Sequence, residues 1–216
     1  MKKIVILLLI ALVCMMPCVA MADGQRTVVA TTYPLYDLAK SICGDLAQVQ
    51  YAPKAEAKGI KADVLLCMGS DADAWVDLLE NVKVIKAVSG LDLIEGSTDA
   101  LTVPVNCMVC ASYFADAMGA VDPQNNAAYQ ENLDAYVAAM GEVDSYIRES
   151  VQAGTRISCV DGSMAYFARE YGLVEVQSEK ADAELNTYNY PAEEQLKTPY
   201  TELLLANLYA LIGEAN

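Results

Sequence analysis

The sequence has 216 residues, with 14 Lys and Arg against 29 Asp and Glu and no histidine, so its formal net charge is −15 at pH 7. Such an acidic chain argues against nucleic acid and anionic membrane surfaces as partners, because both attract basic patches. Acid–base and nucleophilic catalysis usually depend on histidine, and the chain has neither a G-x-S-x-G segment nor a phosphate-binding glycine loop. We therefore do not expect an enzyme.

The first 22 residues have the pattern of an export signal. Two lysines precede an apolar run at 4–13, and residues 20–22 form a small-x-small cleavage site. The run is shorter than the roughly 20 residues that span a bilayer, so we expect cleavage after Ala22 and no integral membrane segment in the periplasmic or secreted product. Lipidation at Cys14 or Cys18 remains an alternative, although neither follows the small residue that such processing prefers.

The next part of the chain alternates strand patterns with helical ones. Pro34 precedes the first helical pattern and Gly44 ends it, whereas Ser70 or Asp71 is the expected cap of the second. Strands alternating with helices predict βαβ units and a parallel sheet. The predicted strands are 28–32, 47–51, 64–67 and 82–85, and the predicted helices are 35–42 and 72–79.

A long amphipathic helix follows, from residue 122 to about 152. Pro123 stands in its first turn, where a helix tolerates proline, and Gly154 marks its end. Apolar residues recur at steps of three and four along it, which predicts one buried face. These residues are Leu133, Tyr136, Val137, Met140, Val143, Ile147 and Val151.

A second, smaller α/β region closes the chain. We predict strands at 156–160 and 173–176, a helix at 163–171, a polar stretch at 177–198 and a last helix at 199–212. The expected fold class is α/β, with two small lobes on parallel sheets joined by one long helix and a truncated C-terminal lobe. The expected domains are a signal at 1–22, an N-lobe at 23–121, a linking helix at 122–153 and a C-lobe at 154–216.

Four segments carry a family resemblance. They are VVATTYPLYDLAKSICGD at 28–45, ADVLLCMGSDADAW at 62–75, the DP-x-N-x-x-x-Y-x-x-N pattern from Asp122 to Asn132, and the Y-F-A-x-x-Y-G-L pattern from Tyr166 to Leu173. The chain resembles the solute-binding subunits of zinc and manganese ABC importers, the TroA-like or cluster A-I family. The resemblance implies a TroA-like periplasmic binding protein that holds a divalent metal ion between its lobes. It also implies an ABC permease and its ATPase as partners.

The resemblance implies a site of three histidines and a carboxylate, which we place on this sequence position by position. The first histidine belongs to a loop that is shortened here, at 51–63, so that ligand is missing. Asp99 takes the second position, by the match of a following proline. Asp161 takes the third, five residues before Tyr166. Asn186 is the nearest counterpart of the late carboxylate.

The set of Asp99, Asp161 and Asn186 consists of oxygen ligands. Carboxylates and carbonyls suit manganese, magnesium and calcium, whereas imidazole suits zinc, so we expect weaker zinc binding than at a histidine site. Zinc and manganese are the ions that the family implies. The alternative is that both aspartates are solvated loop residues. The chain would then be a degenerate paralogue without metal, acting as an interaction or scaffold protein in the periplasm.

The cysteines leave further alternatives open. Cys107 and Cys110 form a C-x-x-C on one face of an apolar helix, and Cys67 and Cys159 fall in predicted buried strands. Core packing is the favoured interpretation of all four. A soft-metal thiolate site or a disulfide involving Cys107 and Cys110 remains as an alternative.

Overall fold

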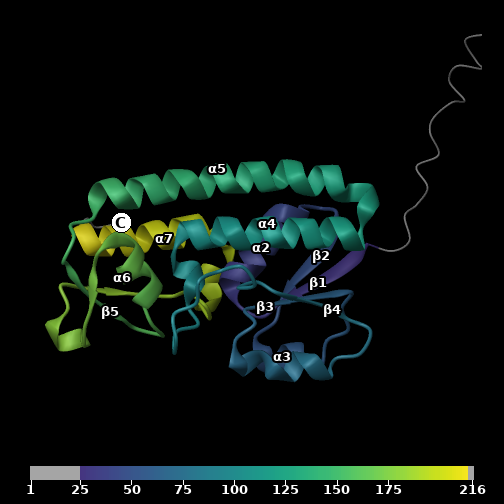
Figure 1. Cartoon of the computed structure of the whole chain (residues 1–216), viewed down its shortest axis with the longest axis horizontal. Helices are drawn as coiled ribbons and strands as arrows, with labels where there is room; N and C mark the ends of the chain where they lie inside the picture. Colours follow the sequence, from purple (N-terminus) through teal and green to yellow (C-terminus); the bar gives the residue numbers. More distant parts are fainter. Residues whose placement is uncertain (1–24, 214–216) are drawn as a thin grey trace, which may run out of the picture.

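The computed structural model describes residues 25–213 (Figure 1). The export signal, with Cys14 and Cys18, lies outside the described residues. Within them, no helix combines the length and the apolar character needed to cross a membrane.

The N-lobe is built on a four-stranded parallel sheet in the order β2-β1-β3-β4. Its strands are β1 (Arg26–Ala30), β2 (Ala47–Tyr51), β3 (Val64–Cys67) and β4 (Lys83–Lys86), and helix α2 (Tyr33–Cys43) connects the first two. All four side chains of β3 are buried, as expected for a central parallel strand. The prediction of βαβ units is confirmed.

Two connections of the N-lobe differ from the sequence prediction. The segment after β2 contains a short helix, α3 (Lys54–Ala57), that we do not predict. The predicted helix at 72–79 is a 3₁₀ helix, η1 (Asp71–Leu78). Asp73 is buried in its first turn and accepts hydrogen bonds from the backbone N–H groups of Gly69 (2.8 Å) and Ser70 (3.3 Å).

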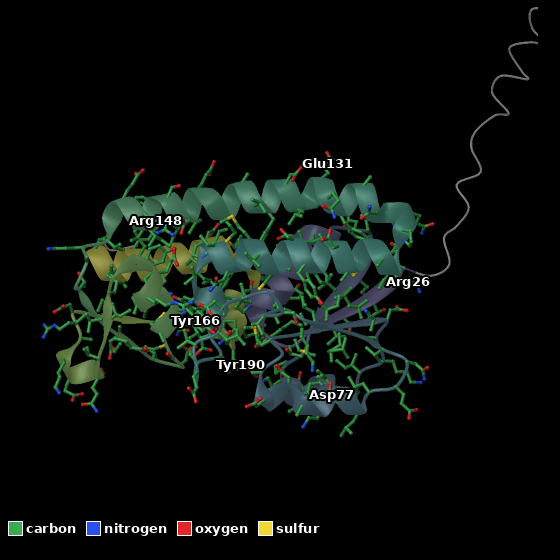
Figure 2. The ribbon with its side chains drawn as sticks, in the orientation of Figure 1. Arg26, Asp77, Glu131, Arg148, Tyr166 and Tyr190 are labelled. Atoms are coloured by element: carbon green, nitrogen blue, oxygen red, sulfur yellow. The ribbon has the colours of Figure 1, made fainter. Side chains whose placement is uncertain are left out.

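Two antiparallel helices lie side by side on the same side of the molecule, and the longer one extends over both lobes (Figure 1). Helix α4 (Pro104–Val121) follows the 3₁₀ turn η2 (Ala100–Thr102), and α5 (Asn126–Ser150) follows the 3₁₀ turn η3 (Pro123–Asn125). The buried residues of α5 are Tyr129, Leu133, Tyr136, Met140, Val143 and Ile147, which confirms the predicted apolar face. Figure 2 shows Glu131 on the outer side of α5, away from both sheets.

The C-lobe is built on a three-stranded parallel sheet in the order β6-β5-β7. Its strands are β5 (Arg156–Cys159), β6 (Val174–Glu175) and β7 (Ala183–Leu185), its helices are α6 (Ala165–Tyr171) and α7 (Tyr200–Ile212), and its 3₁₀ turns are η4 (Ser178–Lys180) and η5 (Glu193–Lys197). Strand β7 lies in the stretch that the sequence predicts as polar and without strand. One continuous core joins the two lobes, since buried residues of both sheets pack against α4, α5 and α7.

The DP-x-N-x-x-x-Y-x-x-N pattern closes the turn between α4 and α5. The buried carboxylate of Asp122 accepts hydrogen bonds from Asn125 Nδ2 (2.7 Å) and from the hydroxyl of the fully buried Tyr129 (2.8 Å). Asn132 donates to the carbonyl of Ile42 at 2.9 Å and so fixes α5 to the end of α2. These residues build the scaffold.

The Y-F-A-x-x-Y-G-L pattern attaches α6 to the neighbouring loop and to α5. Tyr166 accepts a hydrogen bond from the backbone N–H of Ile94 (2.8 Å), and Tyr171 donates to Asp144 of α5 (2.7 Å). Gly172 ends the helix with φ of +70°, a conformation that favours glycine. This pattern therefore orients α6 against the loop after β4 and against α5.

Candidate functional site

The loops at the carboxyl ends of the C-lobe strands contact the N-lobe. Asp161 follows β5, and Thr187 and Asn189 follow β7, so the parallel pairing of these two strands brings the loops together. Asp99 comes from the segment between β4 and α4. We call the contacts of Asp99, Asp161, Thr187 and Asn189 the lobe junction. Figure 2 places Tyr166 and Tyr190 near the same region.

Asp99 is nearly buried. Its carboxylate accepts hydrogen bonds from two residues of the C-lobe and from the hydroxyl of its neighbour Thr98. Oδ2 accepts a hydrogen bond from the backbone N–H of Ser163 (2.9 Å), and Oδ1 accepts one from Asn189 Nδ2 (2.7 Å). A Cβ at Gly162 would meet Asp99 Oδ2 at 2.8 Å, so this glycine lets the carboxylate approach the turn after β5.

Asp161 is exposed and bonded to the neighbouring loop. Its Oδ1 accepts a hydrogen bond from the backbone N–H of Thr187 (2.7 Å), and its Oδ2 accepts one from the Thr187 hydroxyl (2.8 Å). Thr187 also packs beside Asp99, because the same Cβ at Gly162 would meet Thr187 Cγ2 at 2.9 Å. Asp99 and Asp161 therefore lie on two sides of one threonine.

Tyr200, the first residue of α7, connects the segment after Asp99 to the loop after β7. Its hydroxyl lies 3.1 Å from the carbonyl of Leu101 and 3.2 Å from that of Thr187, within hydrogen-bond reach of both. Burial raises the pKa of this tyrosine well above its usual value, and the negative charges of Asp161 and Asp99 add to the shift. The hydroxyl therefore stays protonated and donates at the lobe junction.

Asn186 is oriented differently from the two aspartates. Its side-chain oxygen accepts a hydrogen bond from the backbone N–H of Tyr188 (2.8 Å), within its own loop, while its backbone pairs with the amide of Asn207. Among residues 25–213, no three His, Cys, Asp or Glu side chains come together as a metal-ligand group. The Cys159 thiol lies 3.6 Å from Oδ1 of Asp161, and the other groups that contact the two aspartates are hydroxyl, amide and backbone N–H groups.

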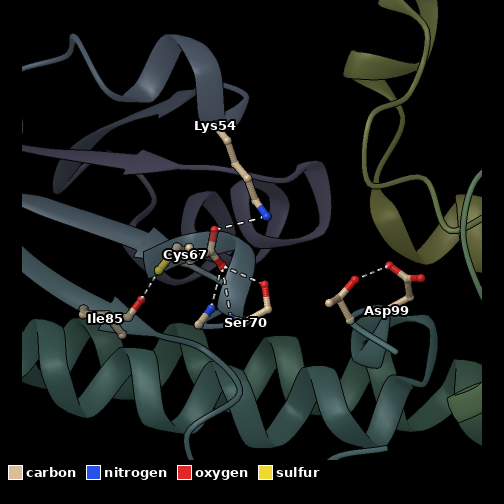
Figure 3. Close-up of polar contacts among 8 residues, drawn as sticks. Lys54, Cys67, Ser70, Ile85 and Asp99 are labelled. Carbon is tan, nitrogen blue, oxygen red and sulfur yellow. Dashed lines mark hydrogen bonds and ion pairs between the residues drawn. The ribbon is translucent and has the colours of Figure 1, made fainter. Parts of the chain in front are cut away.

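The segment that would carry the missing first ligand instead carries a lysine that pairs with a buried aspartate. Lys54 of α3 lies 3.2 Å from Oδ1 of Asp73, whose side chain is fully buried. Figure 3 shows this group, with Ser70 beside it, as separate from Asp99. The Asp73 carboxylate is therefore already paired with an ammonium group and with backbone N–H donors.

The cysteines of the described chain are free thiols. Cys107 donates to the carbonyl of Leu101 (3.1 Å) and Cys110 to that of Ala87 (3.1 Å), and both are buried. The alternative of a disulfide between them is therefore wrong for this structure. Burial raises the pKa of the Cys110 thiol to about 12, which opposes the thiolate that a soft metal needs. Cys159 is only half-buried, contrary to the buried position predicted for it.

Thr187 and Asn189 are not predicted as site residues from the sequence. Both follow β7, a strand of three residues whose polar surroundings hide it. If β7 had been recognised, the position of these side chains just after it would have indicated a site, because ligands bind at the carboxyl ends of the strands in parallel sheets.

The sequence of this chain matches a family model described as "ZnuA: Zinc-uptake complex component A periplasmic" over residues 28–202. The zinc-binding lipoprotein AdcA of Streptococcus pneumoniae is 27% identical over 221 residues, which covers 82% of this chain and 44% of that protein. The chain thus spans less than half the length of this relative. The manganese ABC transporter substrate-binding lipoprotein PsaA of Streptococcus mitis is also 27% identical, over 90% of this chain and 74% of its own length.

Solved structures agree on the fold. The Zn(II)-bound ZnuA-like domain of Streptococcus pneumoniae AdcA superposes with a TM-score of 0.77 at 20% identity, covering 88% of this chain and 98% of that one. The laminin-binding protein Lbp of Streptococcus pyogenes gives 0.75 at 17% identity, covering 90% of this chain and 100% of that one. The two-lobed fold, the ordered patterns and the family match agree: this chain belongs to the ZnuA family of periplasmic zinc-uptake components.

Proposed function

We propose that this chain is the exported solute-binding component of a metal-ion ABC importer, which captures a divalent cation at the lobe junction and delivers it to a permease driven by an ATPase. The observation that carries the proposal is the approach of Asp99, from the N-lobe, to the loop that bears Asp161. A binding protein of this type has its ligand between the lobes, where both contribute. The names of the relatives, which refer to zinc and manganese, support the same substrate class.

The chemistry of the lobe junction favours a hard cation. Asp99 and Asp161 supply carboxylate oxygens, and the neighbouring loop supplies hydroxyl, amide and carbonyl oxygens. Oxygen ligands suit manganese better than zinc. We therefore propose that the lobe junction has a smaller preference for zinc over manganese than a histidine site has.

The role we propose is binding without catalysis. The chain has no histidine to act as a general base, and the carboxylates at the lobe junction are engaged by hydrogen-bond donors. The comparisons give no support to the alternative of a scaffold protein without metal.

The test is a titration of the purified protein, prepared without a histidine tag, with manganese chloride and zinc chloride in a calorimeter. We expect one cation per chain, with zinc bound more weakly than at a histidine site. Asp99→Ala and Asp161→Ala should each weaken binding at least tenfold, because each removes one of two charged ligands. Asp134→Ala, at an exposed position on α5, is the matched control and should leave the affinity unchanged. Absence of binding, or full affinity in both variants, would overturn the proposal.

A further inference from the structure

Asn189 connects the two lobes more extensively than any ligand position that the sequence predicts. Its side-chain amide donates to Asp99 Oδ1 at 2.7 Å. Its backbone carbonyl accepts hydrogen bonds from the backbone N–H of Tyr33 (3.0 Å) and from the hydroxyl of Tyr51 (3.3 Å), both of the N-lobe. The carbonyl fixes the loop against the N-lobe, and the amide is thereby directed at the carboxylate.

The loop that carries Asn189 is also tied to the other aspartate. The Thr187 hydroxyl, which donates to Asp161, accepts a hydrogen bond from the backbone N–H of Asn189 (3.3 Å). Tyr188 between them has φ of +55°, the left-handed region that a tyrosine rarely adopts, and Asn186 Oδ1 accepts from its N–H. A single chain of hydrogen bonds thus runs from Asp161 through Thr187 and Asn189 to Asp99.

An amide donor and a metal cation compete for the same carboxylate lone pairs. The hydrogen of Asn189 Nδ2 points at Oδ1 of Asp99, while the Ser163 N–H already uses Oδ2. A cation that approaches from the Asn189 side must displace this amide. The hydrogen bond to a charged acceptor is also among the stronger types in proteins, so its loss is a substantial cost of binding.

We propose that Asn189 is an internal lock on the lobe junction: its amide holds Asp99 while no cation is bound, and its release sets the cation affinity of the site. The inference rests on the proposed function, since it concerns the same cation. It also assigns Asn189 a specificity role, because a weakly bound ion cannot displace the amide whereas a strongly coordinating one can.

Three variants test the lock. Asn189→Ala removes the donor and keeps the backbone carbonyl contacts, so the affinity for manganese should rise about tenfold, the scale of one hydrogen bond to a charged group. Asn189→Asp places a third carboxylate next to Asp99 at nearly unchanged volume, so it should raise the affinity further and make the midpoint of thermal unfolding strongly dependent on manganese. Tyr51→Phe removes a contact of the same loop but leaves the amide on Asp99, so its affinity should stay within twofold of the wild type.

The measurement is calorimetric titration of the full chain and the three variants with manganese chloride and with zinc chloride, with circular dichroism to verify folding. Wild-type binding with a gain in both Asn189 variants and none in Tyr51→Phe supports the lock. Equal gains in all three would mean that loosening the lobes suffices, which overturns it.

Two further outcomes separate the lock from the proposed function. If the wild type binds manganese and neither Asn189 variant binds it more tightly, the lock is wrong and the importer role stands. If the wild type binds no cation but the Asn189 variants do, the lock is supported and cation capture by the natural chain is refuted. Absence of binding in every protein overturns both.

Discussion

Asp99 and Asp122 are both nearly buried, and each accepts two close hydrogen bonds from other residues, yet the two are held in opposite ways. The donors to Asp122 are three and seven residues away along the chain. Those to Asp99 are 64 and 90 residues away, on the other lobe. The first aspartate stabilises a turn between helices, whereas the second joins two lobes.

This difference separates the scaffold from the binding region. A carboxylate whose donors are local forms as soon as its turn folds, and sequence spacing alone specifies it. A carboxylate whose donors are distant depends on the relative position of the lobes, so a movement of the lobes changes its surroundings. The contacts of Asp122 within the DP-x-N-x-x-x-Y-x-x-N pattern belong to the first kind, and the contacts of the proposed ligand Asp99 belong to the second.

The largest effect on stability is expected at Asp122. Asp122→Ala leaves the buried hydroxyl of Tyr129 and the amide of Asn125 without their acceptor, which should lower the free energy of unfolding by about 3 kcal/mol. Urea denaturation followed by circular dichroism measures this. Asp116→Ala, at an exposed position on α4 that accepts one hydrogen bond from Gln130, is the control and should cost about 0.5 kcal/mol or less. Equal costs would show that the turn is not specified by Asp122.

A third aspartate extends the comparison to pH. Burial raises the pKa of Asp37 to about 6, although the backbone N–H of Tyr200 and the charge of Lys40 oppose the shift. The unfolded chain has a pKa of about 3.9, so the folded protein binds the proton more tightly, and stability falls as the pH rises from about 4 to about 6.

Asp37→Asn should remove this pH dependence and stabilise the protein at pH 7 by about 2 kcal/mol. The measurement is the difference in unfolding free energy between variant and wild type at pH 4.5 and pH 7. Asp134→Asn, exposed on α5, serves as the control for a lost charge. If the difference in unfolding free energy between variant and wild type is the same at both pH values, burial does not raise the pKa of Asp37.

The sequence predicted the scaffold well because its signals are local. Strands β2 and β3 begin and end at the predicted residues, and the long helix differs from its prediction mainly by a 3₁₀ turn over its first three residues. Strand β7 was missed because only Ala183 and Leu185 are buried in it, too few for a visible apolar pattern. Helix α3 was missed because four residues carry no periodicity.

The candidate site was less predictable for a physical reason. The register from Tyr166 points to Asp161, and the match of a proline points to Asp99, but neither signal says what each carboxylate contacts. Asn189 becomes relevant only when β7 pairs with β5 and its loop reaches Tyr33. Asn186 is the nearest counterpart of the late carboxylate in the sequence, but its side chain bonds to its own loop. Whether these residues coordinate a metal stays a prediction.

A smaller effect on stability is expected at Asp99. Asp99→Ala frees two donors, the N–H of Ser163 and the amide of Asn189, but both belong to partly exposed residues that water can reach. We expect a loss of about 1 kcal/mol in the free energy of unfolding, measured by urea denaturation without added metal. A loss as large as that of Asp122→Ala would place Asp99 with the scaffold and remove the contrast between the two aspartates.

The smallest effect is a difference in reaction rate among the thiols. It compares the buried core with Cys159, beside the lobe junction, and involves no change in stability. Burial raises the pKa of Cys43, Cys67 and Cys110 to about 12 and that of Cys159 to about 11, and Cys159 alone of the described cysteines is partly exposed. Brief treatment of the folded protein with iodoacetamide at pH 8 should therefore modify Cys159 first, with all sites reacting slowly.

Mass spectrometry of proteolytic peptides identifies the modified residue, and urea-unfolded protein supplies the reference rate for each thiol. Slower modification of Cys107 and Cys110 than of Cys159 would confirm that the C-x-x-C pair packs on the buried face of α4. Modification of that pair as fast as Cys159 would instead mean that α4 opens to solvent. A thiolate metal site would then compete with the carboxylates of the lobe junction as the binding region.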